Sequence, residues 1–148
     1  MRLMIAALML VFAAGAAQSQ ELVIRESKFG VKETLDRLGA EIEKRGMKVA
    51  ARIDHAAGAK AAGMEMPPTE VLMFGNPKLG TPLMLAAPSV GIDLPMRMMA
   101  WQDKAGKTWI GYAAPEVLKA RHQIAGQDDV LKTMAGALDG LAKVAAGQ

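Results

Sequence analysis

The hydrophobic pattern changes its period along the chain, and this change restricts the possible folds more than any other feature. Apolar residues recur every three or four positions over 31–45, which predicts an amphipathic helix. They alternate with polar residues over 47–54, which predicts a strand with one buried face. The helical stripe comprises Val31, Leu35, Leu38 and Ile42, and the alternating apolar residues are Met47, Val49, Ala51 and Ile53. Only a fold that packs helices on a sheet buries both patterns.

The rest of the chain continues this mixture of elements. Strands are expected at 21–26, 69–75, 96–102 and 107–113, short helices at 55–63 and 115–121, and a final amphipathic helix from 128 to about 144. Residues 76–95 show no clear periodicity, so either a short helix or a functional loop is expected there. Within this segment, 83–87 is able to form a turn or two of helix.

This order predicts an α+β fold built as a two-layer sandwich. The order is strand, helix, four strands, helix, and successive strands pair mainly in antiparallel fashion. The two long amphipathic helices are expected to cover one face of the sheet. We also expect an elongated apolar space between the sheet and the C-terminal helix.

The first twenty residues have the layout of a cleavable signal peptide. Arg2 precedes an uncharged apolar run, Leu3 to Ala17, and small residues follow it. A run of about 15 residues is shorter than the roughly 20 needed to span a bilayer. We therefore expect signal cleavage near Gln20 or Glu21, one domain over 21–148, no stable membrane span after cleavage, and a periplasmic or secreted location.

Composition excludes several classes of function. The chain has no cysteine, which removes lipoprotein attachment, disulfides, thiolate metal sites and cysteine nucleophiles. Its 18 basic and 15 acidic residues are scattered, and no basic run with interleaved aromatic residues predicts nucleic-acid binding. The sequence shows no Ser/His/Asp set, no HExxH motif and no phosphate-binding loop.

Polar residues in the irregular segment are the first candidates for a binding site. One interpretation places Asn76, Lys78, Thr81 and Asp93 at the mouth of a pocket beneath this segment. The alternative is that Asn76 and Asp93 fix two corners through hydrogen bonds from side chain to backbone.

The two histidines are the second set of candidates. His55 and His122 either fasten loops by hydrogen bonding or, with Met64 and Met66, bind copper or haem. An acid–base enzyme that uses His55 with Asp54, or that uses Asp93, is a third possibility. Asp54 alternatively caps the alanine-rich turn that follows it. Met96, Met98 and Met99 fit ordinary packing on both faces of one strand.

Segments over nearly all of residues 21–148 resemble the family catalogued as domain of unknown function 302. The matching residues are Asp54-His55-Ala56-Ala57, Gly63, Pro67-Pro68-Thr69-Glu70, Phe74-Gly75-Asn76-Pro77-Lys78, Gly80-Thr81-Pro82-Leu83-Met84, Ile92-Asp93-Leu94-Pro95, Trp101-Gln102-Asp103, Gly106, Trp109, Tyr112, Pro115 and Arg121-His122. The resemblance implies a fold like that of the TATA-box-binding protein, without implying DNA binding. It also implies small, often dimeric domains with no assigned reaction. Gln102 and Met96 depart from the Glu and Leu expected there.

The sequence thus favours an exported, non-catalytic binding domain, expected as a homodimer. We expect a small apolar or amphipathic ligand between the sheet and the C-terminal helix. Metal or haem binding is the alternative, followed by an acid–base enzyme, and the sequence names no cofactor.

Overall fold

A computed structural model describes residues 21–148 of the protein. The predicted signal peptide, residues 1–20, lies outside the described residues. The elements are β1 (Leu22–Ser27), α1 (Val31–Lys44), β2 (Lys48–Asp54), α2 (His55–Ala61), β3 (Thr69–Gly75), α3 (Pro77–Ala86), the 3-10 helix η1 (Pro88–Ile92), β4 (Met96–Gln102), β5 (Thr108–Ala113), α4 (Pro115–His122) and α5 (Asp128–Ala146).

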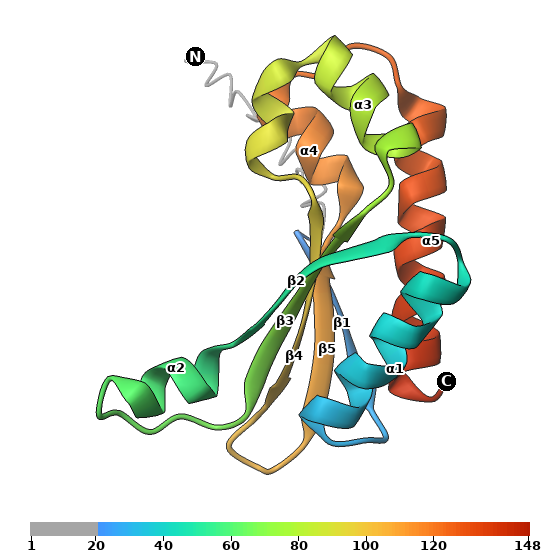
Figure 1. Ribbon diagram of the computed structural model, residues 1–148. Helices are drawn as coiled ribbons and strands as arrows, with labels where there is room; N and C mark the ends of the chain where they lie inside the picture. The colour runs from blue at the N-terminus through green and yellow to red at the C-terminus, as the bar shows by residue number, and fades with distance from the viewer. Residues whose placement is uncertain (1–20) are drawn as a thin grey trace, which may run out of the picture.

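The five strands form one sheet in the order β1-β5-β4-β3-β2, and every neighbouring pair is antiparallel. Helices α1 and α5 pack against each other and against one face of this sheet (Figure 1). The predicted α+β sandwich is therefore confirmed. The helix from Asp128 extends two residues beyond the predicted end, to Ala146.

The predicted helical stripes form the core between the two layers. Leu35, Leu38 and Ile42 of α1 are fully buried, as is Leu141 of α5. Burying an aliphatic side chain of this size stabilises the folded state by about 1.5–3 kcal/mol. These contacts hold α1 and α5 on the sheet in a chain that has no disulfide.

Strand β2 does not keep one buried face, so that prediction is wrong in part. The pairing with β3 shifts its register between Val49, which lies opposite Phe74, and Ala51, which lies opposite Met73. The extra residue, Ala50, turns the following side chains to the other face of the sheet. Val49 therefore packs towards the helices, whereas Ile53 lies on the face that the helices leave uncovered.

Residues 76–95 form helices instead of a loop. The side chain of Asn76 caps α3 by accepting a hydrogen bond from the Lys78 backbone N–H at 2.9 Å. Pro77 occupies the first helical turn, where its missing N–H costs nothing. This helix is difficult to predict from the sequence because it contains Gly80 and Pro82, which are both poor helix formers. With η1 and α4, α3 lies beyond one end of the sheet (Figure 1).

Between residues 21 and 148, no helix combines the length and the apolar character needed to cross a membrane.

Candidate functional site

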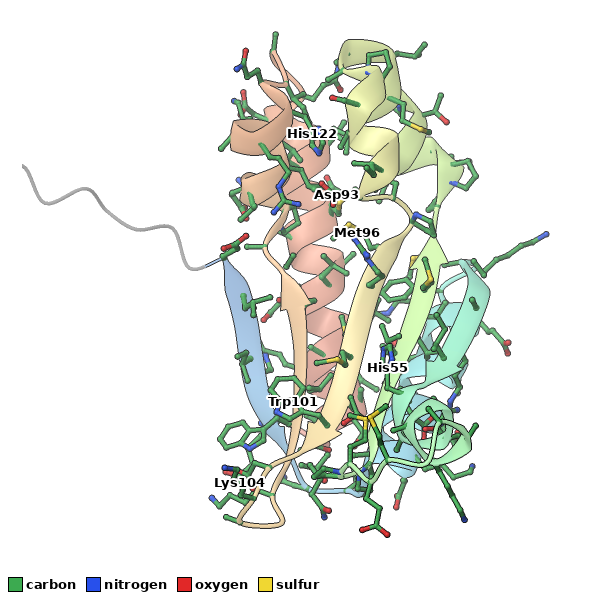
Figure 2. All side chains as sticks on the ribbon, turned by 90° about the vertical axis from the view of Figure 1, so that its left-hand side faces the viewer. His55, Asp93, Met96, Trp101, Lys104 and His122 are labelled. Carbon is green, nitrogen blue, oxygen red and sulfur yellow. The ribbon has the colours of Figure 1, made fainter. Side chains whose placement is uncertain are left out.

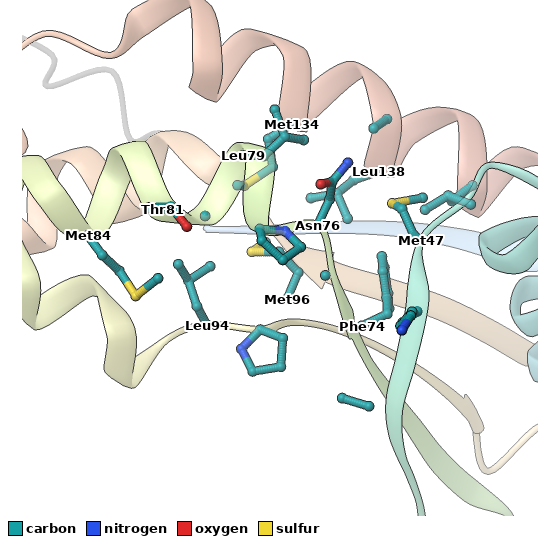
Figure 3. A pocket seen from close by; sticks show the side chains of 18 of the residues that line it. Met47, Phe74, Asn76, Leu79, Thr81, Met84, Leu94, Met96, Met134 and Leu138 are labelled. Atoms are coloured by element: carbon teal, nitrogen blue, oxygen red, sulfur yellow. The ribbon is translucent and has the colours of Figure 1, made fainter.

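A cavity of about 590 Å³ lies where α3, α5 and the adjacent ends of β2, β3 and β4 meet. Figure 3 shows side chains from these elements converging on it. Its position agrees with the expected space beside the C-terminal helix, but α3 supplies an additional wall. The long body of α5 is otherwise packed tightly against the core.

The floor of the cavity is apolar and buried. Phe74, Met96, Met134 and Leu138 line it, and each of these side chains is at most 7% exposed. Met134, Ala137, Leu138 and Leu141 belong to α5, the final amphipathic helix that the sequence predicted, so this helix serves both the core and the cavity. Such a floor excludes an unpaired charge, because burying one without a partner is costly.

Polar groups border the cavity at its more exposed side. Lys48, Asn76 and Thr81 belong to its wall, and Lys48 and Thr81 are exposed. Asn76 thus has two positions at once, as the cap of α3 and as a wall residue. Lys78 and Asp93 do not belong to the wall, although the sequence grouped both with Asn76 and Thr81 at the mouth of a pocket.

Asp93 is the anchor of a charged cluster that joins η1 to α4. Its Oδ2 lies 2.7 Å from Nε2 of His122, and the Arg121 guanidinium contacts both carboxylate oxygens at 3.0 and 3.1 Å. The hydrogen bond with His122 and the contacts with Arg121 lower the pKa of Asp93 from its usual 3.8, against the effect of burial. Asp93 therefore fixes its corner by ion pairing with side chains, whereas Asn76 does so through backbone bonding, as predicted.

Ser89, His122 and Asp93 form a hydrogen-bonded chain that sequence spacing did not show. Ser89 Oγ lies 2.9 Å from Nδ1 of His122, whose side chain is only 6% exposed. An ionised carboxylate accepts only, so Nε2 of His122 donates to Asp93, and Nδ1 forms the hydrogen bond with the Ser89 hydroxyl. The sequence analysis found no Ser/His/Asp set, and this hydrogen-bonded chain corrects that conclusion. Neither Ser89 nor His122 lines the cavity above.

His55 lies at the opposite end of the sheet from His122 (Figure 2). It begins α2, where the neighbouring Asp54 caps the helix by accepting from the Ala57 N–H at 2.8 Å. The cap interpretation of Asp54 is therefore the one the structure supports. Within residues 21–148, no three or more His, Asp or Glu side chains are grouped so as to hold a metal ion.

Sequence reasoning missed several wall residues of the cavity. Leu79, Met84 and Leu94 come from the segment that lacked periodicity, and Met47 precedes β2. The only available signal was the family string that runs from Phe74 to Met84, which now proves to be one end of β3 followed by α3.

The comparisons with known proteins place this chain and its fold in a family. The family described as "Domain of unknown function DUF302" matches residues 23–141. A crystal structure of an uncharacterized conserved DUF302 protein from Bacillus stearothermophilus superposes with a TM-score of 0.69 and 21% identity, covering 87% of this chain and 98% of that one. At this identity the likeness concerns the fold alone.

Two curated relatives are named as ion channels. Both are named "Fluoride-specific ion channel FluC 1", from Brucella suis biovar 1 (strain 1330) and Brucella abortus biovar 1 (strain 9-941), and both are 44% identical over 127 residues. The match covers 85% of this chain but 50% and 47% of these proteins, so the chain spans about half the length of the relatives. The name was given to the full-length relatives, of which this chain matches about half.

The family model matches 119 of the 148 residues. These residues include all five strands of the antiparallel sheet except Leu22, together with helix α1 and most of α5. This chain belongs to the family of domain of unknown function DUF302.

Proposed function

We propose that the protein binds a small amphipathic molecule in the cavity between α3 and α5. The observation that carries this proposal is the combination of a buried apolar floor with three polar residues at the exposed side. A cavity of about 590 Å³ falls within the range of about 300–1,000 Å³ typical of small-molecule sites.

The chemistry of the wall indicates how the bound ligand is oriented. An apolar tail fits the floor made by Phe74, Met134 and Leu138, because burying it there removes apolar surface from water and breaks no hydrogen bond. A polar or anionic head fits beside the Lys48 ammonium group, with the Thr81 hydroxyl and the Asn76 amide as further partners. Dodecanoate has both parts and is a suitable probe.

The test is isothermal titration of the purified domain with dodecanoate. The wild type is expected to bind about one molecule per chain, with a Kd in the micromolar range. Ala137→Phe places a ring in the cavity wall and is expected to weaken binding at least about tenfold. Ala135→Phe, on the same helix but outside the wall, is the matched control and should bind as the wild type does.

Charge provides an independent check on the orientation of the ligand. Lys48→Ala is expected to weaken dodecanoate more than dodecanol, and Lys60→Ala on α2 should change neither. No saturable binding up to about 1 mM, or equal losses in Ala135→Phe and Ala137→Phe, would refute the proposal. We do not propose that His55 and His122 hold a metal ion or haem together, since the two residues lie at opposite ends of the sheet (Figure 2).

We further propose that the domain acts in the periplasm or after secretion, as a pair of identical chains. The support for export is the layout of residues 1–20, with a basic start and an uncharged apolar run. Mass spectrometry of protein from the cell envelope should give an N-terminus at Gln20 or Glu21. Recovery of the chain with Met1 intact from the cytoplasm alone would contradict export.

A further inference from the structure

The last turn of α3 and the whole of η1, residues 84–92, form an apolar end of the molecule that we call the tip. Figure 1 shows α3 and η1 beyond one end of the sheet, at the opposite end of the molecule from α2. Among the large apolar side chains of residues 21–148, Leu85 and Ile92 are the most exposed, at 82% and 81%. Met84 is 38% exposed, so the tip presents three large apolar side chains to water.

The exposed side chains of the tip belong to two segments that touch each other. A Cβ added to Gly91 would lie 3.6 Å from Sδ of Met84, so the Met84 side chain rests on the backbone of η1. Leu85 and Ile92 are the next residues in the chain after Met84 and Gly91, so each emerges beside this contact. Exposed apolar side chains that gather in one patch, unlike scattered ones, mark an interaction surface.

The tip carries no charged side chain and one polar side chain, that of Ser89. The Ser89 hydroxyl is already engaged, because its Oγ lies 2.9 Å from Nδ1 of His122. Over the longer stretch 71–92, the only charged residue is Lys78, which is exposed. Leu85 follows Lys78 by seven positions, so both lie on the same side of α3, about 10 Å apart along the helix axis. The tip is thus an uncharged apolar surface with one cation set back from it.

Most carboxylates at this end of the molecule are paired with cations. The residue that follows the tip, Asp93, contacts three basic side chains, those of Arg97, Arg121 and His122. Asp128 and Asp129 begin α5 at the same end of the molecule, and Asp128 pairs with Lys119. Negative charge near the tip is therefore offset, apart from that of Asp129, and does not oppose an approach to lipid phosphates.

The tip borders the ligand cavity. Met84 and Gly91 belong to the cavity wall, and so does Thr81, which lies at the exposed side. Figure 3 shows Thr81 and Met84 on α3 at the edge of the cavity. Leu85 follows Thr81 by one helical turn, so a surface in contact with Leu85 also reaches the exposed side of the cavity.

We propose that the tip docks on a phospholipid bilayer and that the cavity exchanges its amphipathic ligand with that bilayer. This inference rests on the proposed function, for which it names the source of the ligand. Leu85 and Ile92 enter the boundary between headgroups and acyl chains, about 5–10 Å deep, which leaves the Lys78 ammonium group at the level of the phosphates. A bilayer is the occupant because it takes up apolar side chains without asking for hydrogen bonds, whereas a protein partner normally forms hydrogen bonds at the rim of an interface. The tip has no free side-chain hydrogen-bonding group to offer a protein.

The test is co-sedimentation of the domain with phosphatidylcholine vesicles that contain about one-fifth phosphatidylglycerol. The wild type is expected to reach half-saturation at about 0.1–1 mM lipid, as a few inserted apolar side chains allow. Leu85→Glu and Ile92→Glu should each weaken vesicle binding at least about tenfold, because a carboxylate resists insertion. Met64→Glu makes the same kind of change at a residue that is 61% exposed and lies beyond α2, so it should bind vesicles as the wild type does. Circular dichroism melting checks that each variant is folded.

Titration with dodecanoate in the absence of vesicles separates this inference from the proposed function. Leu85 lies outside the cavity wall, so Leu85→Glu should bind dodecanoate as the wild type does, yet take it up from loaded vesicles at least about tenfold more slowly. A wild type that binds dodecanoate but no vesicles up to about 5 mM lipid would overturn the docking and leave the cavity proposal standing. Vesicle binding by a chain that binds no dodecanoate would overturn the cavity proposal and the exchange with it.

Two further outcomes would assign the tip to something other than a bilayer. An equal loss of vesicle binding in Met64→Glu and Leu85→Glu would overturn the docking, because the effect would then come from added charge alone. Sedimentation velocity should give the same oligomeric state for Leu85→Glu and the wild type. A change of oligomeric state in Leu85→Glu would make the tip a contact between protein chains and would also overturn the docking.

Discussion

Replacing Asp93 by Asn should destabilise the domain more than its surface position indicates. The carboxylate is 12% exposed and holds His122, which is 6% exposed, together with the Arg121 guanidinium. The amide of Asn keeps the shape and still accepts from Nε2 of His122, but it removes the negative charge. The variant therefore isolates the charge of Asp93 from its geometry.

The magnitude follows from the contacts that the charge strengthens. Hydrogen bonds to charged groups contribute about 1.5–3 kcal/mol, and neutral ones about half as much. Arg121 is half exposed, so its contribution is screened and the bond with His122 dominates. We expect Asp93→Asn to lower the free energy of unfolding by about 1–2 kcal/mol, which corresponds to about 4–8 °C in Tm for a domain of this size.

The effect should depend on pH in one direction. Because the pKa of Asp93 is lowered from 3.8 in the folded protein, its ionised form adds stability that is fully present above that value. This stability is lost as the pH falls through the folded-state pKa. The difference in unfolding free energy between wild type and Asp93→Asn should therefore be full at pH 5 and shrink at pH 3 and below.

Urea unfolding followed by circular dichroism provides the measurement. His55→Ala, at an exposed position at the other end of the sheet, is the control and should stay within about 0.5 kcal/mol of the wild type. An Asp93→Asn variant as stable as the wild type at pH 5, or one whose deficit is unchanged at pH 3, would refute the reasoning.

Three further substitutions test the packing of the sheet and of the segments beside it. Thr34→Val removes a fully buried hydroxyl that lies 2.7 Å from Ser27 Oγ and donates to the Gly30 carbonyl at 2.9 Å, so the free energy of unfolding should fall by about 1–3 kcal/mol in urea titration. Gly111→Ala brings a Cβ to 3.2 Å from the Trp101 ring and the Val23 carbonyl, and it should lower Tm and shift the tryptophan emission. Asp103→Ala removes the acceptor of the Trp109 Nε1 hydrogen bond at 2.8 Å, and near-ultraviolet circular dichroism should show a less ordered indole. A variant that matches the wild type in its assay would contradict the corresponding contact.

The layers of the fold could be predicted from the sequence because periodicity reports which side of an element is buried. The stripe from Val31 to Ile42 and the alternation in the β strands each specify one face, and antiparallel order follows from short connections. The bulge at Ala50 could not be predicted, since a one-residue shift in register leaves the composition unchanged. Helix α3 was obscured because Pro82 and Gly80 are rare inside helices.

The candidate site was predicted only where local chemistry decides it. Asn76 caps a helix through its own neighbours, so sequence adjacency was sufficient. Asp93 and His122 are 29 residues apart, and only the packing of η1 on α4 brings their side chains together. The cavity likewise arises where α3, α5 and the ends of three strands meet, and no single segment encodes it.

Methionine methyl NMR tests the central claim most directly, because methionines lie both in the cavity wall and far from it. Met47, Met84 and Met134 line the cavity, whereas Met64 and Met66 lie between α2 and β3 and do not line it. Titration with dodecanoate should shift the methyl resonances of the first three and leave those of Met64 and Met66 unchanged. Shifts confined to Met64 and Met66, or no saturable shift at all, would contradict a ligand site between α3 and α5.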